Sequence, residues 1–229
     1  MPSNRYPIIA REGWPVLALL LVVLGVAYYF HFLGDTVAVI TAAVMLVSLF
    51  LLRDPAQIIP TSPLSIVSPV FGRIVSVEEV NDPWVERQAL QIRIKMSLFD
   101  IYSLRSPMEG KIVNQWTRRP EGKTVKRKFA FRIRSDEGDE VVVVVYLNLF
   151  GPLSFRFYAH SGERLGHGQR CGYLYFGGTI DVLVPKNSKI SVKPGDKINS
   201  GSGVLAHLVH NNGTASVIHD DQDNDLKQS

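Results

Sequence analysis

Two apolar stretches near the N-terminus constrain this chain more than any other feature. Residues 14–33 read WPVLALLLVVLGVAYYFHFL without a charged side chain, and residues 36–52 are apolar again after Gly34-Asp35. Each stretch approaches the roughly 20 residues that a helix needs to cross a bilayer. The pattern predicts a transmembrane helical hairpin over residues 14–52, preceded by an N-terminal cytoplasmic segment, residues 1–13.

The charges beside these stretches predict an orientation. Arg5, Arg11 and Arg53 flank the hairpin on the same side. Because basic residues concentrate in cytoplasmic loops, we expect a bacterial-type inner-membrane protein whose remaining chain faces the cytoplasm. A cleaved signal peptide is the alternative. Its hydrophobic region spans only about 7–15 residues and ends at a small-residue cleavage site, and this chain shows neither feature.

The rest of the chain predicts a mainly β fold. Residues 53–63 carry three prolines and are expected to form a linker. Short β-branched runs separated by turn residues then predict a small barrel or sandwich-like domain over residues 64–208, with no long helix. The predicted strands are 66–67, 73–77, 90–95, 111–113, 129–134, 141–147 and 180–184. Residues 209–229 are polar and are expected to be a disordered tail.

Two segments of the predicted β domain look alike. SPVFGRIVSV starts at Ser68 and SPMEGKIVNQ starts at Ser106, and each places a glycine after Ser-Pro and two variable residues. We expect the two segments to open equivalent hairpins, with Gly72 and Gly110 supplying a positive φ where a strand turns.

The charge of the chain is modestly basic, with a formal net charge of +4. A dense basic run is predicted to form a lipid-facing surface, and a solvated loop is the alternative. The residues of this basic run are Arg118, Arg119, Lys123, Lys126, Arg127 and Lys128. A nucleic-acid partner is not expected, because no known nucleic-acid module surrounds the run. The single cysteine excludes an internal disulfide, and the His and Glu spacing predicts no metal site.

Several motifs occur in one order along the chain. They are IAREGWP (9–15), RDPAQIIP (53–60), SPVFGRI (68–74), MSLFDIYSLRSPMEGKI (96–112), GQRCGYLYFGGTIDVLVP (168–185) and VKPGDKI (192–198). This ordered set resembles the small, single-domain form of phosphatidylserine decarboxylase over roughly residues 8–208.

The resemblance implies a proenzyme that cuts itself. In that family a serine hydroxyl attacks the preceding carbonyl, and elimination leaves an N-terminal pyruvoyl group, which serves as the electron sink for decarboxylation. A histidine and an aspartate are expected to assist the serine. The partner it implies is a membrane phospholipid, phosphatidylserine or phosphatidylethanolamine.

The residues at these three positions differ from the family's pattern. Gly178 stands at the serine position, Tyr102 at the histidine position and Phe71 at the aspartate position. Glycine has no hydroxyl, so no pyruvoyl group can form there, and no other cofactor is expected. The resulting hypothesis is a non-catalytic homologue that binds phospholipid or a protein partner, either an active relative or a second copy of itself.

Two alternatives remain open. Thr179 follows Gly178 and could act as the nucleophile, which would leave an α-ketobutyryl group in an active lipid decarboxylase. More remotely, Lys95-Met96 and VKPGDKI resemble the hairpins of biotinyl and lipoyl carrier domains, in which Lys95 would be the modified residue.

Overall fold

A computed structural model describes most of the chain. It covers residues 14–30, 35–51, 53, 57–60, 62, 64–118, 128–147 and 155–209. The predicted cytoplasmic segment 1–13, the polar tail beyond residue 209 and the centre of the basic run, residues 119–127, lie outside the described residues.

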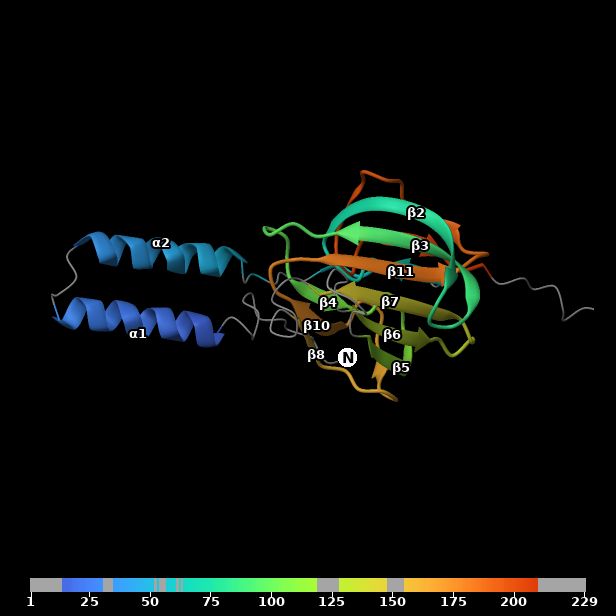
Figure 1. Cartoon of the computed structure of the whole chain (residues 1–229), viewed down its shortest axis with the longest axis horizontal. Helices are drawn as coiled ribbons and strands as arrows, with labels where there is room; N and C mark the ends of the chain where they lie inside the picture. The colour runs from blue at the N-terminus through green and yellow to red at the C-terminus, as the bar shows by residue number, and fades with distance from the viewer. Residues whose placement is uncertain are drawn as a thin grey trace, which may run out of the picture.

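Two helices form the N-terminal part. The helices α1 (Trp14–Phe30) and α2 (Asp35–Leu51) have 17 residues each, lie side by side and project away from the β domain (Figure 1). A helix of this length measures about 25 Å, whereas the hydrocarbon core of a bilayer is about 30 Å thick. Among the described residues, no helix is both long and apolar enough to cross a membrane. The helical hairpin is thus present, but the prediction that it spans the membrane is not confirmed.

Every element described between Leu64 and Val209 is a strand, as the sequence predicted. The strands are β1 (Ser65–Val67), β2 (Gly72–Asp82), β3 (Arg87–Lys95), β4 (Ser103–Arg105), β5 (Gly110–Arg118), β6 (Lys128–Arg134), β7 (Glu140–Tyr146), β8 (Phe155–Phe157), β9 (Arg164–Leu165), β10 (Arg170–Leu174), β11 (Thr179–Pro185), β12 (Lys189–Ile190), β13 (Lys197–Ile198) and β14 (Val204–His207). All seven predicted strands fall on strands of the structure.

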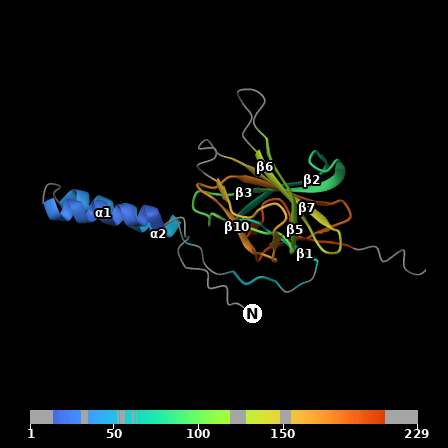
Figure 2. The same ribbon diagram turned by 90° about the horizontal axis from the view of Figure 1, so that it is seen from below.

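One large sheet and two small sheets enclose the core. The large sheet has the order β13-β2-β3-β11-β7-β6-β5-β9, and the small sheets have the orders β1-β14-β12 and β4-β10-β8. The strand pairs of the described residues are antiparallel, and the large sheet curls around the interior (Figure 2). The fold is therefore mainly β with a half-barrel form.

The central strand β11 is buried on both faces of the large sheet. Ile180, Val182 and Val184 belong to the main core, whereas Leu183 joins a second apolar cluster on the outer face. Because side chains alternate between faces along a strand, residues 179, 181 and 183 share that outer face. The Thr179 side chain therefore lies on the outer face, whereas a side chain at residue 178 would lie on the core face.

The two Ser-Pro-x-x-Gly segments do occupy equivalent places, for a different reason than predicted. Gly72 begins β2 and Gly110 begins β5, and neither has a positive φ. A Cβ on Gly72 would lie 2.6 Å from the carbonyl oxygen of Lys95, and one on Gly110 would lie still closer to that of Arg134. The glycines are needed because each strand approaches its hairpin partner's backbone closely.

Candidate functional site

Three strands bring Phe71 and Gly178, two of the positions singled out in the sequence, to one edge of the large sheet. Arg73 near the start of β2 pairs with Lys95 at the end of β3, and Lys95 pairs in turn with Thr179 at the start of β11. Phe71 and Gly178 come just before these strand starts, so both lie at this edge, which we call the site edge. In Figure 1 the site edge is the side of the β domain nearest the helices.

The connection from β10 to β11 makes a tight turn at the site edge. Phe176 and Gly177 have φ values of 63° and 70°, and Phe176 remains 48% exposed. Two consecutive left-handed residues are uncommon, and a non-glycine residue there costs on the order of 1 kcal/mol. The turn is held against the segment after β3, because the Met96 amide donates a 2.8 Å hydrogen bond to the Gly178 carbonyl.

Tyr102 reaches this turn from the segment after β3. Its side chain is 2% exposed, its hydroxyl donates a hydrogen bond to the Leu98 carbonyl, and its ring centroid lies 6.4 Å from that of Phe176. Burial raises the pKa of the Tyr102 hydroxyl, and the nearby Asp100 carboxylate raises it further. A phenol whose pKa is raised and whose hydroxyl already donates a hydrogen bond to a backbone carbonyl does not act as a general base at neutral pH.

The side on which residue 178 would carry a side chain can be read from its neighbours. A Cβ on Gly178 would meet Cδ2 of Leu174 at 3.0 Å, and Leu174 belongs to the main core together with Tyr102. Thr179 faces the outer side by alternation along β11. A hydroxyl at 178 would thus point to the side of Tyr102, whereas the Thr179 hydroxyl points away from it.

Known proteins resemble the chain over nearly its whole length. The family model for phosphatidylserine decarboxylase matches residues 46–206. The phosphatidylserine decarboxylase proenzyme of Nitrosomonas eutropha is 37% identical over 213 residues, covering 89% of this chain and 96% of that protein. Those of Nitrosomonas europaea and Paraburkholderia xenovorans are 34% and 35% identical, covering 90% and 89% of this chain and 98% of each of those proteins. The chain belongs to the phosphatidylserine decarboxylase family.

The pyruvoyl group of this family does not fit the residues at the site edge. It derives from a side chain with a β-oxygen, and Gly178 has no side chain. Phe71, which the sequence motif predicts to stand at the position of the aspartate, is a partly buried apolar residue that carries no charge. A pyruvoyl group therefore cannot form at residue 178 of this chain.

On the outer face, a charged cluster lies beside Thr179. Asp181 is 2% exposed and accepts hydrogen bonds from Gln91, Arg93 and Tyr146 at 2.7–2.9 Å. The Arg93 guanidinium keeps its charge, because its hydrogen bonds to Asp181 raise its pKa. Every polar atom of the Asp181 carboxylate is thus engaged, and the cluster offers no base that is free to serve Thr179.

The predicted basic run begins and ends at the site edge. Arg118 ends β5 and pairs with Lys128, which begins β6, and Lys128 pairs with Tyr146 beside Thr179. The Lys128 ammonium lies 4.9 Å from the centre of the Tyr146 ring. The intervening residues Arg119, Lys123, Lys126 and Arg127 lie outside the described residues, so the lipid-facing surface stays a prediction.

Lys95 does not have the setting of a carrier lysine. It is the last residue of β3 and pairs with Arg73 on one side and Thr179 on the other. A carrier lysine sits instead at the tip of a tight turn between strands. The ladder position of Lys95 and the family membership both speak against the carrier alternative.

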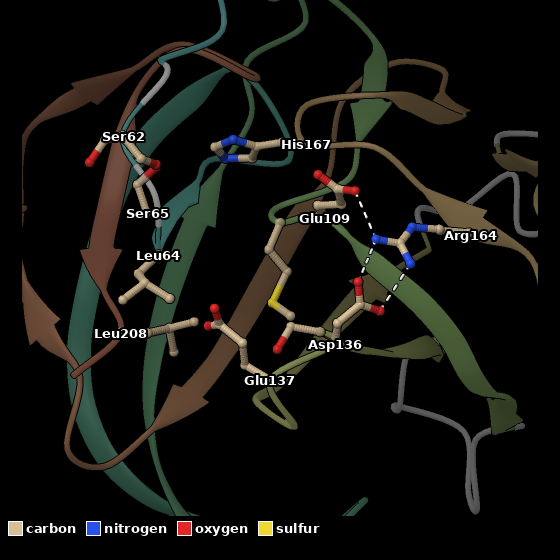
Figure 3. Close-up of a pocket in the computed structure, with 11 residues that line it drawn as sticks. Ser62, Leu64, Ser65, Glu109, Asp136, Glu137, Arg164, His167 and Leu208 are labelled. Atoms are coloured by element: carbon tan, nitrogen blue, oxygen red, sulfur yellow. Dashed lines mark hydrogen bonds and ion pairs between the residues drawn. The ribbon is translucent and has the colours of Figure 1, made fainter. Parts of the chain in front are cut away.

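A pocket of about 300 Å³ opens at the opposite edge of the large sheet, next to the end of β6 (Figure 3). Arg164 bridges Glu109 and Asp136 at its rim, with nitrogen–oxygen distances of 2.9 and 2.6 Å. His167 lines the pocket beside Glu109, and burial lowers its pKa. No group of three or more His, Cys, Asp or Glu side chains suited to a metal occurs in the part of the chain that the structure describes.

Sequence reasoning missed one feature of the site edge. Leu98 and Phe99 follow β3 and are 58% and 67% exposed, directly beside Tyr102. Apolar residues in a β-rich sequence are normally assigned to the core, and the pattern SLFD gave no signal that these two point outward.

Proposed function

We propose that this chain is a non-catalytic member of the phosphatidylserine decarboxylase family that binds phospholipid at a membrane surface. One observation carries the proposal: the residue just before β11, at which a side chain would point into the core against Leu174, is Gly178, which cannot supply a hydroxyl. The residues predicted for the other two roles are also unsuited to them, because the Tyr102 hydroxyl donates its hydrogen bond to the Leu98 carbonyl and Phe71 is apolar.

The helix pair supports the membrane part of the proposal. Apolar side chains on both helices are exposed, for example Leu19 at 64%, Val39 at 68% and Leu46 at 68%. A continuous apolar surface of this extent marks a membrane or protein contact. Because the site edge lies nearest the helices (Figure 1), a bilayer that covers the helices would lie close to the residues at the family positions.

The family relationship supports the choice of ligand. The relatives are named phosphatidylserine decarboxylase proenzymes, so the ligand class that we propose is an aminophospholipid, phosphatidylserine or its product phosphatidylethanolamine. A chain that binds but does not convert such a lipid would act as a regulator or scaffold, alone, with a second copy or with an active relative. The inner membrane and its cytoplasmic face are part of this proposal.

Processing at Thr179 is the second candidate, and one contact favours it. The Gly178 carbonyl, which the Thr179 hydroxyl would attack, accepts the hydrogen bond from the Met96 amide, and such a bond polarises a carbonyl. The Thr179 side chain, however, lies on the outer face, away from Tyr102 and beside a fully engaged Asp181. This placement means that neither Tyr102 nor Asp181 is free to act as the base for the hydroxyl.

Intact mass of the purified, detergent-solubilised chain tests the proposal. We expect one uncut chain, unchanged after incubation with phosphatidylserine, and no release of carbon dioxide from that lipid. Flotation with vesicles that contain phosphatidylserine should carry the same protein to the top of a gradient. Two fragments that meet at Gly178-Thr179 would overturn the non-catalytic reading, and a Thr179→Ala variant that stays uncut would then assign the nucleophile.

A further inference from the structure

The segment after β3 carries an exposed apolar tip at the site edge. Leu98 and Phe99 are 58% and 67% exposed, and Phe176, in the turn before β11, is 48% exposed. We call these three side chains the apolar rim. A globular domain normally exposes large apolar side chains singly, and a cluster of them marks a contact surface.

The rim is one surface and not three isolated side chains. Tyr102 joins its parts, since its hydroxyl bonds to the Leu98 carbonyl and its ring lies 6.4 Å from that of Phe176. The turn that carries Phe176 also packs on the same segment, because a Cβ on Gly177 would lie 3.0 Å from the Ser97 carbonyl oxygen. Tyr102 thus contacts both the segment that carries Leu98 and Phe99 and the turn that carries Phe176.

The backbone beneath the rim satisfies its own polar groups. The Ser97 amide donates a 2.6 Å hydrogen bond to the Asp100 carboxylate, and the Asp100 amide donates back to the Ser97 carbonyl at 3.2 Å. This closed turn holds Leu98 and Phe99 at its tip with few free donors or acceptors. Such a tip can enter the boundary between headgroups and acyl chains at little cost, because unpaired polar groups are what apolar surroundings penalise.

The rim continues into the helix pair. Arg53, just after α2, donates hydrogen bonds to the Phe50 carbonyl at 2.8 Å and to the Phe99 carbonyl at 3.3 Å. Its guanidinium also lies 3.9 Å from the centre of the Phe50 ring, and Phe50 is 51% exposed. One arginine therefore ties the exposed end of α2 to the tip, with its positive charge at the junction.

From this continuity we propose that Leu98, Phe99 and Phe176 insert into the bilayer beside the helices and place Tyr102 and Gly178 at the level of the lipid headgroups. The occupant of the rim is phospholipid and not a protein. Arg53 and the exposed Lys95 supply positive charge next to the rim, which suits phosphate groups, while Asp100 is engaged within the turn. This inference rests on the proposed membrane function.

A fluorescent probe at the rim tests the insertion. The single native cysteine, Cys171, is 1% exposed, and burial raises its pKa, so a thiol reagent will label an introduced surface cysteine instead. The Phe99→Cys full-length chain is labelled with an environment-sensitive dye and moved from detergent into phosphatidylethanolamine–phosphatidylglycerol vesicles. The matched control is Val209→Cys, which is 42% exposed in the wild type and lies near Asn187, at the opposite edge from Thr179.

We expect the Phe99→Cys probe to brighten, to shift to shorter wavelength and to be quenched by brominated acyl chains, while the Val209→Cys probe stays water-like. The doubly changed Leu98→Ser/Phe99→Ser chain should bind vesicles about tenfold more weakly. If the Phe99→Cys probe keeps the emission it has in water while the chains still float with vesicles, the proposed insertion of the rim is wrong but the membrane proposal stands. Failure of the wild-type chain to float would overturn the membrane proposal as well. A probe that responds to protein concentration without vesicles would assign the rim to a protein contact and also overturn the proposal.

Discussion

The hydroxyl of Tyr146 donates a 2.7 Å hydrogen bond to Oδ2 of Asp181, a carboxylate that is only 2% exposed. Asp181 also accepts two hydrogen bonds from Arg93, at 2.8 and 2.9 Å. The cluster of Arg93, Asp181 and Tyr146 lies on the outer face of the large sheet and joins the three adjacent strands β3, β11 and β7 next to the site edge. This cluster fixes the register of the strands that position Gly178.

Replacing Asp181 by Asn should destabilise the fold. The change removes the negative charge that Arg93 faces and leaves a buried amide that cannot accept all the same bonds. Because the Arg93 side chain is 37% exposed, water will offset part of the loss, and we expect about 2–3 kcal/mol. Urea unfolding of the full chain in detergent measures this, with Asp136→Asn in the exposed Arg164 pair as the control. Equal effects of the two changes would contradict the assignment.

The stability of the fold should fall in alkaline solution because of Tyr146. Burial is the main cause that raises the pKa of Tyr146 to about 12, from an ordinary value of 10.0. Between these values the unfolded chain loses the phenolic proton and the folded chain keeps it, so stability is complete below pH 10 and falls toward pH 12. Since Tyr146 is half-buried, we expect a loss on the order of 1 kcal/mol. A pH series of urea unfolding for wild type and Tyr146→Phe isolates this step, because the variant should lack it; identical curves would exclude Tyr146.

Replacing Gly178 by Ser should not restore self-cleavage. The new hydroxyl would face the side of Tyr102, but Tyr102 is no base and Phe71 cannot orient one. The added Cβ would crowd Leu174 at 3.0 Å and cost about 1 kcal/mol, as would Gly178→Ala, the matched control. Intact mass should show one uncut chain for both.

The triple variant Phe71→Asp/Tyr102→His/Gly178→Ser should be cut before residue 178. Cleavage of the single variant would show that other residues already supply the base.

Replacing Tyr102 by Phe should make the turn at residues 97–100 more mobile without leaving a cavity in the core. The change removes only the hydroxyl that donates to the Leu98 carbonyl, so we expect a stability loss of about 1 kcal/mol. Backbone amides of residues 97–100 should exchange hydrogen faster, while those of the central strand β11 should not change beyond the global loss. Unchanged exchange at the tip would show that the Ser97–Asp100 turn holds it alone.

The long strands could be predicted from the sequence because each contains enough apolar β-branched residues to indicate which of its faces are buried. Residues 140–146 read EVVVVVY, and β7 is buried on both faces, as continuous β-branched residues indicate. The short strands β4, β8 and β10 were not predicted, because SLR and FRF are too short to show a period and depend on distant partners. The requirement for glycine at Gly72 likewise comes from the Lys95 carbonyl, far along the chain.

The sequence motifs identified the candidate site residues but not how these residues are arranged in space. Gly178, Thr179, Tyr102 and Phe71 were identified from the sequence, but their arrangement was not. That Thr179 faces away from Tyr102 follows from the alternation along β11. The apolar rim was missed because the sequence does not distinguish an exposed Leu-Phe pair from a buried one.

Neutralising the basic run should weaken binding to anionic lipid. The two described ends of the run, Arg118 and Lys128, lie at the site edge, on the side of the domain nearest the helices. Each base close to an anionic surface contributes about 1 kcal/mol, so Lys126→Gln/Arg127→Gln should bind phosphatidylglycerol vesicles roughly thirtyfold more weakly at low salt. The matched control, Lys186→Gln/Lys189→Gln, removes the same charge from the opposite edge and should change binding little. Raising the salt concentration should shrink the difference, because exposed charges are screened. Equal losses for the two pairs would show that only the net charge matters, and the basic run would then be a solvated loop.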